Sequence, residues 1–298
     1  MTQTTIVKRI LLLGSIAMGV ALPAPAQTAD AIIAKARAYL GGDAALNAVN
    51  SVHFSGVLEP DNATPAGPKP ANAAIDIIFQ KPYQQRIVAT GADSVETTAL
   101  DGYSAWQRIQ EVRNRNRWKL SVMGPDQIKR LRANTWENLY FFKDIEQRGG
   151  HTEVLGPATV DGQPAVKVAF LHEAGIVFYR YFNPETGRLL LTETEQGGSI
   201  REEGEIMVNG LRFPQKVTQT VKGVDAKGQP AERKLAMIFD KITINETFPE
   251  SYFDLPLAGP SGPPPTAGAS SPAPVAPVGP APVVTPPNPP PAPGPAGH

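Results

Sequence analysis

The chain has 298 residues, with 28 basic and 28 acidic side chains, 31 prolines and no cysteine. A formal net charge of zero gives no overall field that would steer the protein onto nucleic acid, so no nucleic-acid partner is expected. The absence of cysteine excludes disulfides, thiolate nucleophiles, cysteine-ligated metal sites and a lipid-modified N-terminal cysteine.

Residues 1–26 have the pattern of an export signal peptide. Lys8 and Arg9 precede an apolar run over 10–22, and Ala24-Pro25-Ala26 has the small side chains of a signal-peptidase site. The run is shorter than the roughly 20 apolar residues that a membrane-spanning helix needs. We therefore expect cleavage after Ala26 and a periplasmic or secreted protein, and an uncleaved membrane anchor is the alternative.

Residues 257–298 form a separate proline-rich tail. They hold more than half of the prolines and no charged side chain, so they lack the apolar bulk to build a core. Proline runs such as 263–265 and 289–291 favour polyproline II. We expect a disordered spacer. The alternative is a tether that docks on cell-envelope partners through Pro-x-x-Pro segments.

Residues 27–256 are expected to form one β-rich domain that opens with two helices. Apolar side chains recur at helical spacing over 29–40, and Gly41-Gly42 supply the stop of this helix. A second short helix is predicted to begin with Asp43 as its N-cap and to carry Leu46 inward.

From residue 52 onward the apolar pattern changes to the two-residue period of β-strands. Glycine and proline turn signals, such as Asp101-Gly102, separate the segments. One long helix interrupts the strands and begins near Gly124-Pro125-Asp126, where proline fits the first helical turn. The predicted strands cover 52–58, 74–80, 83–90, 94–100, 103–110, 152–160, 164–171, 175–182, 188–195, 199–208, 211–222 and 233–245.

This pattern predicts a mainly β fold with some α. A sheet of about eleven or twelve antiparallel strands usually curls into a barrel or half-barrel. The N-terminal and central helices are then expected to cover its open side.

Four segments resemble the LolA/LolB-like family of periplasmic lipoprotein carriers. Residues 38–56 are similar to the opening helix and first strand of its divergent members. Residues 79–106, with Lys81-Pro82 and an Asp-Gly-x-x-x-Trp sequence, are similar to its Lys-Pro turn and following hairpin. Residues 209–214 resemble a late hairpin, and residues 242–256 resemble the last strand with its Phe-x-x-Pro close. The resemblance implies a curved half-barrel whose helices lid an apolar cavity.

The resemblance also implies a non-catalytic carrier without a cofactor. Its cavity would hold a lipid or the acyl chains of a lipidated protein, exchanged with membrane-protein donors or acceptors. Burial of an acyl chain is favourable by about 0.8 kcal/mol per CH₂, so a modest pocket can hold a chain and still release it. For each candidate lining residue the alternative is ordinary core packing. The candidates are Ile77, Phe79, Ile87, Trp106, Leu131, Trp136, Leu139, Val177 and Tyr179.

A dense cationic patch is predicted at Arg113, Arg115, Arg117 and Lys119. If this segment is extended, alternate residues share one face of a strand. The cations would then receive anionic head groups or an acidic partner at the cavity mouth. The alternative is a solvated strand face.

We find no motif for catalysis or metal binding. The four histidines are dispersed, and His172-Glu173 lacks the second histidine of a zinc-peptidase helix. Glutamates between 193 and 205 alternate along predicted strands and are expected to face solvent. There is no Gly-x-Ser-x-Gly, phosphate-binding loop or dinucleotide fingerprint.

The sequence therefore predicts a non-catalytic binding protein that holds a lipid or another apolar ligand between sheet and helices. One alternative is an envelope interaction module whose barrel is filled by its own side chains and whose tail contacts partners. A second is a hydrolase whose nucleophile and base are distant in sequence. An open apolar cavity would favour carriage, whereas titratable groups clustered in a cleft would favour an enzyme.

Overall fold

The computed structural model describes residues 28–61, 71–224 and 229–256. The predicted export signal over 1–26 and the proline-rich tail over 257–298 lie outside these described residues. Both therefore stay predictions. No helix within the described ranges is long and apolar enough to cross a membrane.

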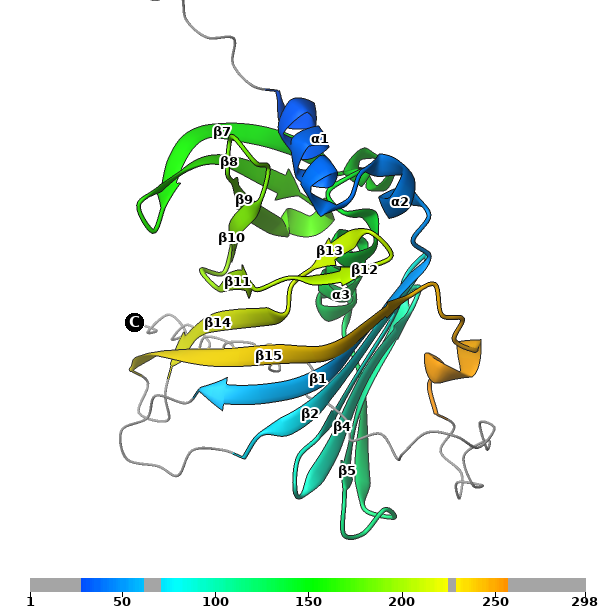
Figure 1. The fold of residues 1–298 in the computed structure, drawn as a ribbon. Helices are drawn as coiled ribbons and strands as arrows, with labels where there is room; N and C mark the ends of the chain where they lie inside the picture. The colour runs from blue at the N-terminus through cyan, green and yellow to red at the C-terminus, as the bar shows by residue number, and fades with distance from the viewer. Residues whose placement is uncertain (1–27, 62–70, 225–228, 257–298) are drawn as a thin grey trace, which may run out of the picture.

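A 13-stranded antiparallel sheet forms the body of the protein (Figure 1). It curves strongly, but its two edge strands do not pair with each other, so the barrel stays open. In sheet order the strands are β6 (Trp118–Val122), β5 (Ser104–Glu111), β4 (Ser94–Asp101), β3 (Gln84–Thr90), β2 (Ala73–Gln80), β1 (Ser51–Asp61), β15 (Pro230–Ile244), β14 (Lys216–Val224), β11 (Ser199–Glu203), β10 (Leu189–Thr194), β9 (Val177–Phe182), β8 (Gln163–Leu171) and β7 (His151–Val160). The predicted curved antiparallel half-barrel is confirmed.

Two predicted strands are broken in two, and one strand was not predicted. Gly204, with φ 66°, separates β11 from β12 (Ile206–Val208), and Pro214, which has no N–H for a ladder bond, separates β13 (Leu211–Phe213) from β14. The short β12 and β13 leave the main sheet and form a separate hairpin. Its Asn209-Gly210 turn has positive φ at both residues, as a two-residue hairpin turn requires. The unpredicted strand is the edge strand β6.

The helices begin and end close to their predicted positions. Helix α1 (Ala29–Leu40) ends at Gly41, whose φ of 135° strongly favours glycine. Helix α2 (Asp43–Asn47) has Gly42 as its N-cap, so the prediction that Asp43 caps it was wrong. The Asp43 carboxylate instead accepts a hydrogen bond from Nε of Arg37 in α1. This ion pair joins the two helices where the chain turns.

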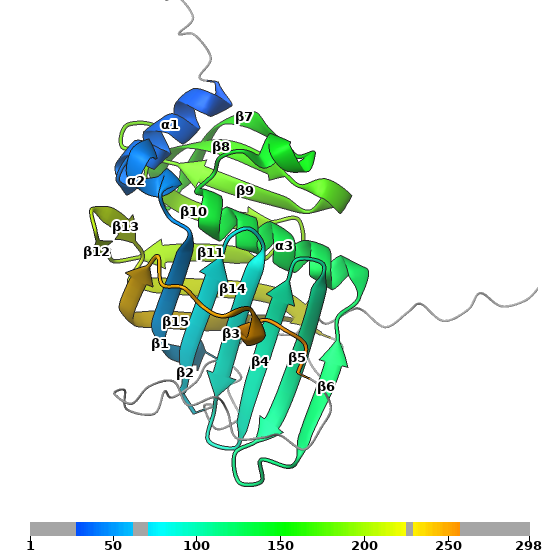
Figure 2. The same cartoon turned by 90° about the vertical axis from the view of Figure 1, so that its right-hand side faces the viewer.

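The central helix α3 (Pro125–Tyr140) bridges two parts of the sheet. Its N-terminus is closed by Gln127, whose side chain accepts the Gly124 N–H at 3.0 Å. It packs against β2, β3 and β4 and also against the short helix η2 (Glu173–Gly175). Figure 2 shows α3 running across the ends of β2–β5, below the strands β7–β10. The helix therefore spans the open side of the curved sheet.

The two largest of four apolar clusters in the described residues lie at different parts of the sheet. One packs Leu46 of α2 and Phe213 of the β12–β13 hairpin against β1, β2 and β15. The other packs α1 against β8 and β9 around Phe170 and Phe182, both fully buried. Members of both clusters line the cavity described next, among them Phe54 and Phe79 of the first and Phe178 of the second.

Candidate functional site

A cavity of about 1120 Å³ lies between the inner face of the sheet and α3. In β2 and β15 the residues that line it are alternate ones, as the two-residue period of a strand requires. Its volume is at the upper end of the range of ordinary small-molecule pockets. The apolar part of the wall includes Phe54, Leu58, Ile77, Phe79, Ile87, Phe213, Val217, Leu235, Met237 and Phe239.

Four of the nine residues predicted as cavity lining lie in this wall: Ile77, Phe79, Ile87 and Leu131. The first three come from β2 and β3, and Leu131 comes from the inner side of α3. The structure thus brings them together around one space. Their contact with a ligand stays a prediction.

The other five predicted lining residues lie outside the cavity wall. Trp106 faces the outer side of the sheet, where its Nε1 donates to the Phe253 carbonyl at 2.9 Å. Trp136 stacks between Tyr83 and Tyr140, with ring centroids 5.9 Å and 3.4 Å away.

Leu139, Val177 and Tyr179 complete that group. Leu139 is fully buried in the apolar cluster that holds α2 against β1 and β2. Val177 lies at the start of β9, where its N–H donates to Glu195 at 3.2 Å. Tyr179 lies beneath Lys167, whose Nζ is 4.6 Å from its ring centroid. For these residues the alternative of ordinary packing describes the structure better.

The largest part of the apolar wall comes from strands whose residues were not named as candidates. Leu235, Met237 and Phe239 are alternate residues of β15, and Val217 lies on the neighbouring β14. Residues 235–239 are all apolar, so no alternation of apolar and polar side chains marked the inward face. Nothing in the sequence showed that β15 would pair with β1 and so continue the inward face of β2 and β3.

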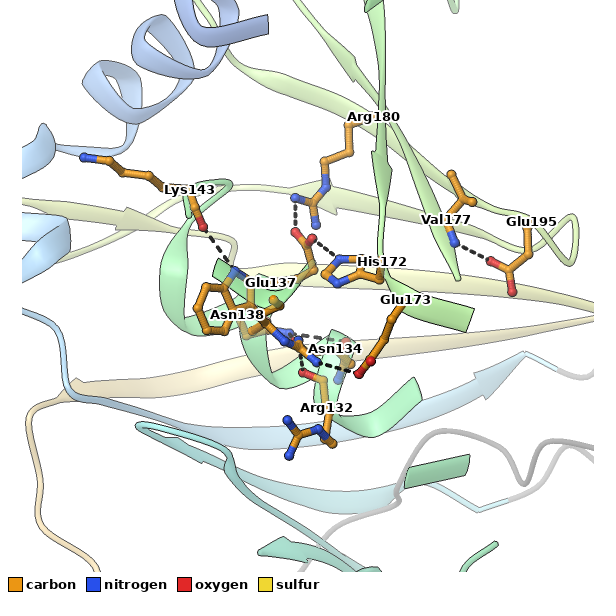
Figure 3. A network of polar contacts seen from close by, with 12 residues as sticks. Arg132, Asn134, Glu137, Asn138, Lys143, His172, Glu173, Val177, Arg180 and Glu195 are labelled. Carbon is orange, nitrogen blue, oxygen red and sulfur yellow. Dashed lines mark hydrogen bonds and ion pairs between the residues drawn. The ribbon is translucent and has the colours of Figure 1, made fainter. Parts of the chain in front are cut away.

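A buried ionic network occupies one side of the cavity (Figure 3). The Glu137 carboxylate, from α3, accepts hydrogen bonds from Arg180 of β9 and from His172 Nε2, the latter at 2.6 Å. All three side chains are at most 8% exposed. Burial by itself raises the pKa of Glu137, but the charge of Arg180 and the contact with His172 outweigh it and lower that pKa. Glu137 is therefore a carboxylate that ties the helix to the sheet.

Glu202 faces the cavity as well, although it was expected to face solvent. On β11, Ile200 and Glu202 point inward, while Glu203 points outward and binds Lys216 at 2.9 Å. Burial raises the pKa of Glu202, and the nearby charges of Arg180 and Arg188 offset this only in part. Among the residues that the structure describes, no hydrogen bond or ion pair is formed by the Glu202 carboxyl.

The remaining glutamates of this acidic stretch are paired. Glu193 accepts from the Tyr181 hydroxyl at 2.6 Å, and Glu195 binds Arg130. Glu205 accepts hydrogen bonds from Tyr39 and from Arg212, the second at 2.5 Å. Of these three glutamates only Glu205 lines the cavity.

The predicted cationic patch does not lie on a strand. Residues 112–117 form the turn between β5 and β6, so Arg113, Arg115 and Arg117 do not alternate on one strand face as expected. Only Lys119 belongs to β6. Asn114 and Asn116 favour this turn because an Asx side chain can bond to the backbone two residues on, and Asn114 Oδ1 accepts the Asn116 N–H at 3.1 Å.

The cations lie on an exposed hairpin tip, and none of the four lines the cavity. Arg113 and Arg117 form exposed ion pairs with Asp93 at 3.7 Å and Glu111 at 3.4 Å. The hairpin also exposes Trp118 and Val112. A role in binding head groups or an acidic partner stays a prediction.

His53 forms the most concentrated polar cluster on the outer face. Its Nδ1 lies 2.9 Å from Glu246 and its Nε2 lies 2.8 Å from Asp76, with the Ser55 hydroxyl at 3.3 Å. Burial lowers the pKa of His53, but the hydrogen bonds and charges of the two carboxylates outweigh it and raise that pKa. Both ring nitrogens are thus engaged with carboxylates, and the Ser55 hydroxyl itself donates to Asp76 at 3.3 Å. The arrangement does not activate a serine nucleophile.

No group of three or more His, Asp or Glu side chains in the described ranges is arranged to hold a metal ion. His151 and Glu153 lie on the edge strand β7.

Comparisons with known proteins find similar folds at low sequence identity. No protein-family model and no curated protein matches the chain. A DUF1329 family protein from Desulfovibrio piger aligns with 76% of this chain and 96% of its own, at 8% identity and a TM-score of 0.48. A putative outer membrane lipoprotein-sorting protein domain from Vibrio parahaemolyticus aligns with 75% of this chain and 94% of its own, at 8% identity and a TM-score of 0.46. The lipoprotein LppX from Mycobacterium tuberculosis aligns with 74% of this chain and 99% of its own, at 12% identity and a TM-score of 0.26.

Proposed function

We propose that this protein is an exported, non-catalytic carrier that holds the acyl chain of a lipid or lipidated protein in the cavity beneath α3. The supporting observation is the size and character of that cavity, about 1120 Å³ with apolar side chains from β1, β2, β3, β14 and β15. A sheet filled by its own side chains, as the interaction-module alternative requires, would leave no such space.

The energetics of acyl burial suit a carrier. Each buried CH₂ contributes about 0.8 kcal/mol, so on the order of ten methylenes give about 8 kcal/mol. By affinity arithmetic this corresponds to roughly micromolar binding before the cost of ordering the ligand is subtracted. Such a ligand is held during transit through water and can be passed to an acceptor that buries it better.

The charged residues of the cavity wall can bind the polar head group of the ligand. Arg180, Arg188 and Glu202 all line the cavity, and Glu202 is paired directly with Val217 of the apolar wall. A polar head group there keeps hydrogen-bonding partners that a purely apolar pocket would deny it. An amphiphile therefore fits better than a pure hydrocarbon.

The expected partners follow from this function. A lipid or lipidated protein is the cargo, and membrane-protein donors and acceptors would load and unload it in the periplasm or outside the cell. The proline-rich tail is the candidate contact to other envelope proteins. The alternative function, an interaction module without cargo, is favoured by the exposed side chains of the β5–β6 hairpin rather than by the cavity.

The test is to fill the cavity and to measure what the protein carries. The full chain is exported to a bacterial periplasm, purified without detergent and extracted with organic solvent for mass spectrometry. Leu235→Trp places a large ring in the cavity, whereas Lys234→Trp places the same ring on the outer face of the same strand.

We expect near-stoichiometric lipid or lipopeptide in the wild-type protein and in Lys234→Trp, and a large loss in Leu235→Trp with a retained thermal transition. An extract without lipid from folded wild-type protein would contradict carriage and favour the interaction module. Equal lipid in both variants would place the cargo outside this cavity.

A further inference from the structure

The last described segment of the chain crosses the outer face of the sheet, strand by strand. Glu246 contacts His53 of β1, and the Phe248 N–H donates to Gln80 of β2 at 3.0 Å. Further on, the Tyr252 ring lies under Arg86 of β3, 5.2 Å from the guanidinium carbon. Figure 2 shows this segment running across β2, β3 and β4 to β5.

The crossing segment is anchored firmly on β5. Phe253 is fully buried, and its carbonyl accepts the hydrogen bond from the Trp106 indole. The described chain ends three residues later, at Pro256. The next strand in the direction of travel is the edge strand β6.

β6 presents an uncovered apolar strip on this same outer face. Val122 is paired directly opposite Trp106, so the two side chains point to the same side of the sheet. Leu120 and Trp118 follow at alternate positions along the strand. Val122 is 67% exposed and Trp118 is 41% exposed. An apolar strip of this kind at a free sheet edge normally marks a contact surface.

The opposite edge strand, β7, is protected in a way that β6 is not. It has a register shift between Val154 and Gly156, and Pro157 follows, which removes a backbone donor. β6 pairs with β5 without a register shift and has no proline. We therefore expect another segment or molecule to pack against the unpaired backbone groups and the apolar strip of β6.

We propose that residues 257–265, the start of the proline-rich tail, dock on the apolar strip Trp118, Leu120 and Val122 and cover the edge of β6. The segment reads Leu-Ala-Gly-Pro-Ser-Gly-Pro-Pro-Pro, apolar and without charge. Proline-rich segments bind aromatic side chains in polyproline II form because little conformational entropy is lost. Trp118 is the exposed aromatic residue that such a segment needs.

The lengths agree with this placement. Neighbouring strands are about 4.8 Å apart, so one strand spacing separates Trp106 from Val122. From Val122 to Trp118 the strand covers about 13 Å at roughly 3.3 Å per residue. A polyproline II segment rises about 3.1 Å per residue, so about five residues follow the whole strip. The nine residues from 257 to 265 suffice for both distances.

A photo-cross-linking experiment on the full chain tests this docking. Val122→p-benzoylphenylalanine places the probe in the strip, and Leu155→p-benzoylphenylalanine places it on the other edge strand, at a residue that is also exposed. Irradiation followed by fragmentation mass spectrometry maps the attached residues. We expect intramolecular attachment within 257–265 from position 122 and none in the tail from position 155.

Two matched tail variants separate docking from mere proximity. In the near variant Leu257, Pro260, Pro263, Pro264 and Pro265 are changed to serine; in the far variant Pro286, Pro287, Pro289, Pro290 and Pro291 are changed. We expect the near variant to reduce the cross-link yield at least about fivefold, the factor that corresponds to losing about 1 kcal/mol of docking. The far variant should leave the yield unchanged.

Three results would overturn the proposal. Equal yields in the two tail variants would mean that the tail only passes near β6. Attachment spread along 257–298, or no attachment at all, would mean that residues 257–265 do not dock on the strip. Attachment to a second chain that increases with protein concentration would assign β6 to an interface between copies.

Discussion

Glu137→Gln should destabilise the protein far more than the same change at an exposed glutamate. The change keeps the shape of the side chain but removes the charge that binds Arg180 and His172. Arg180 is 7% exposed and would then be a buried guanidinium without a counterion. Its Nε already lacks a hydrogen-bond partner, so cation–π contacts with Phe142, Phe170 and Phe178 would be its main remaining contacts.

The expected cost follows from the burial of the pair. Removing one partner of a buried ion pair costs about 3–5 kcal/mol, because the remaining charge is left uncompensated. For a domain of this size each kcal/mol lowers Tm by about 2–4 °C, so we expect Tm to fall by roughly 6–20 °C. Glu203→Gln is the matched control, since this exposed glutamate on β11 binds only Lys216 and should cost less than about 1 kcal/mol.

Urea and thermal unfolding, followed by circular dichroism, measure both variants. A further variant, Glu137→Met with Arg180→Met, should recover most of the loss, because hydrophobic side chains often replace a buried ion pair without net cost. If Glu137→Gln shifted Tm no more than Glu203→Gln does, the network would not be holding α3 to β9. If the double variant were less stable than Glu137→Gln, the loss would not come from the unpaired guanidinium.

Two further predictions concern the outer surface. The pKa of His53 is raised in the folded protein, so its contribution to stability is fully present below its unfolded value of about 6.5 and is lost as pH rises through the raised folded pKa. The stability lost in His53→Gln should therefore be larger at pH 5.5 than at pH 9 in urea titrations, and a constant difference would contradict this reasoning. Replacing Arg113, Arg115 and Arg117 by serine should weaken binding to anionic vesicles on the order of tenfold or more at low salt, with Tm nearly unchanged. Unchanged vesicle binding in a co-sedimentation assay would mean that these arginines are only a solvated part of the turn and do not bind anionic head groups.

The sequence was sufficient for most strands and helices because their periodicity and turn residues are local signals. The bounds of α1 agree with the prediction, and most strands lie within one or two residues of their predicted ranges. β6 was not predicted because its five residues, Trp118–Val122, directly follow a cluster of arginines that was itself read as extended. Gly204 and Pro214 were readable breaks, but the long polar and apolar alternation around them favoured unbroken strands.

The site was harder to predict from the sequence than the fold, because a cavity depends on contacts between distant parts of the chain. Large aromatic residues were natural candidates for its wall, yet Trp106 and Trp136 form hydrogen bonds and stacks elsewhere. Glu202 shows the reverse error. Glutamate is seldom buried, so a solvent-facing position was the reasonable prediction, and only the register with Val217 on β14 reveals that it points inward.

The way in which α3 is held explains why a cavity of this size persists. An apolar helix face packed directly onto the inner sheet would gain burial energy by closing the space. On α3, polar and cation–π contacts do much of the holding. Arg132 lies over Tyr83 and Tyr103, and Glu137 is fixed to β9 through Arg180. These contacts are directional, so they stabilise the helix without requiring its whole face to pack onto the sheet. The apolar strands beneath are then left for a ligand to cover.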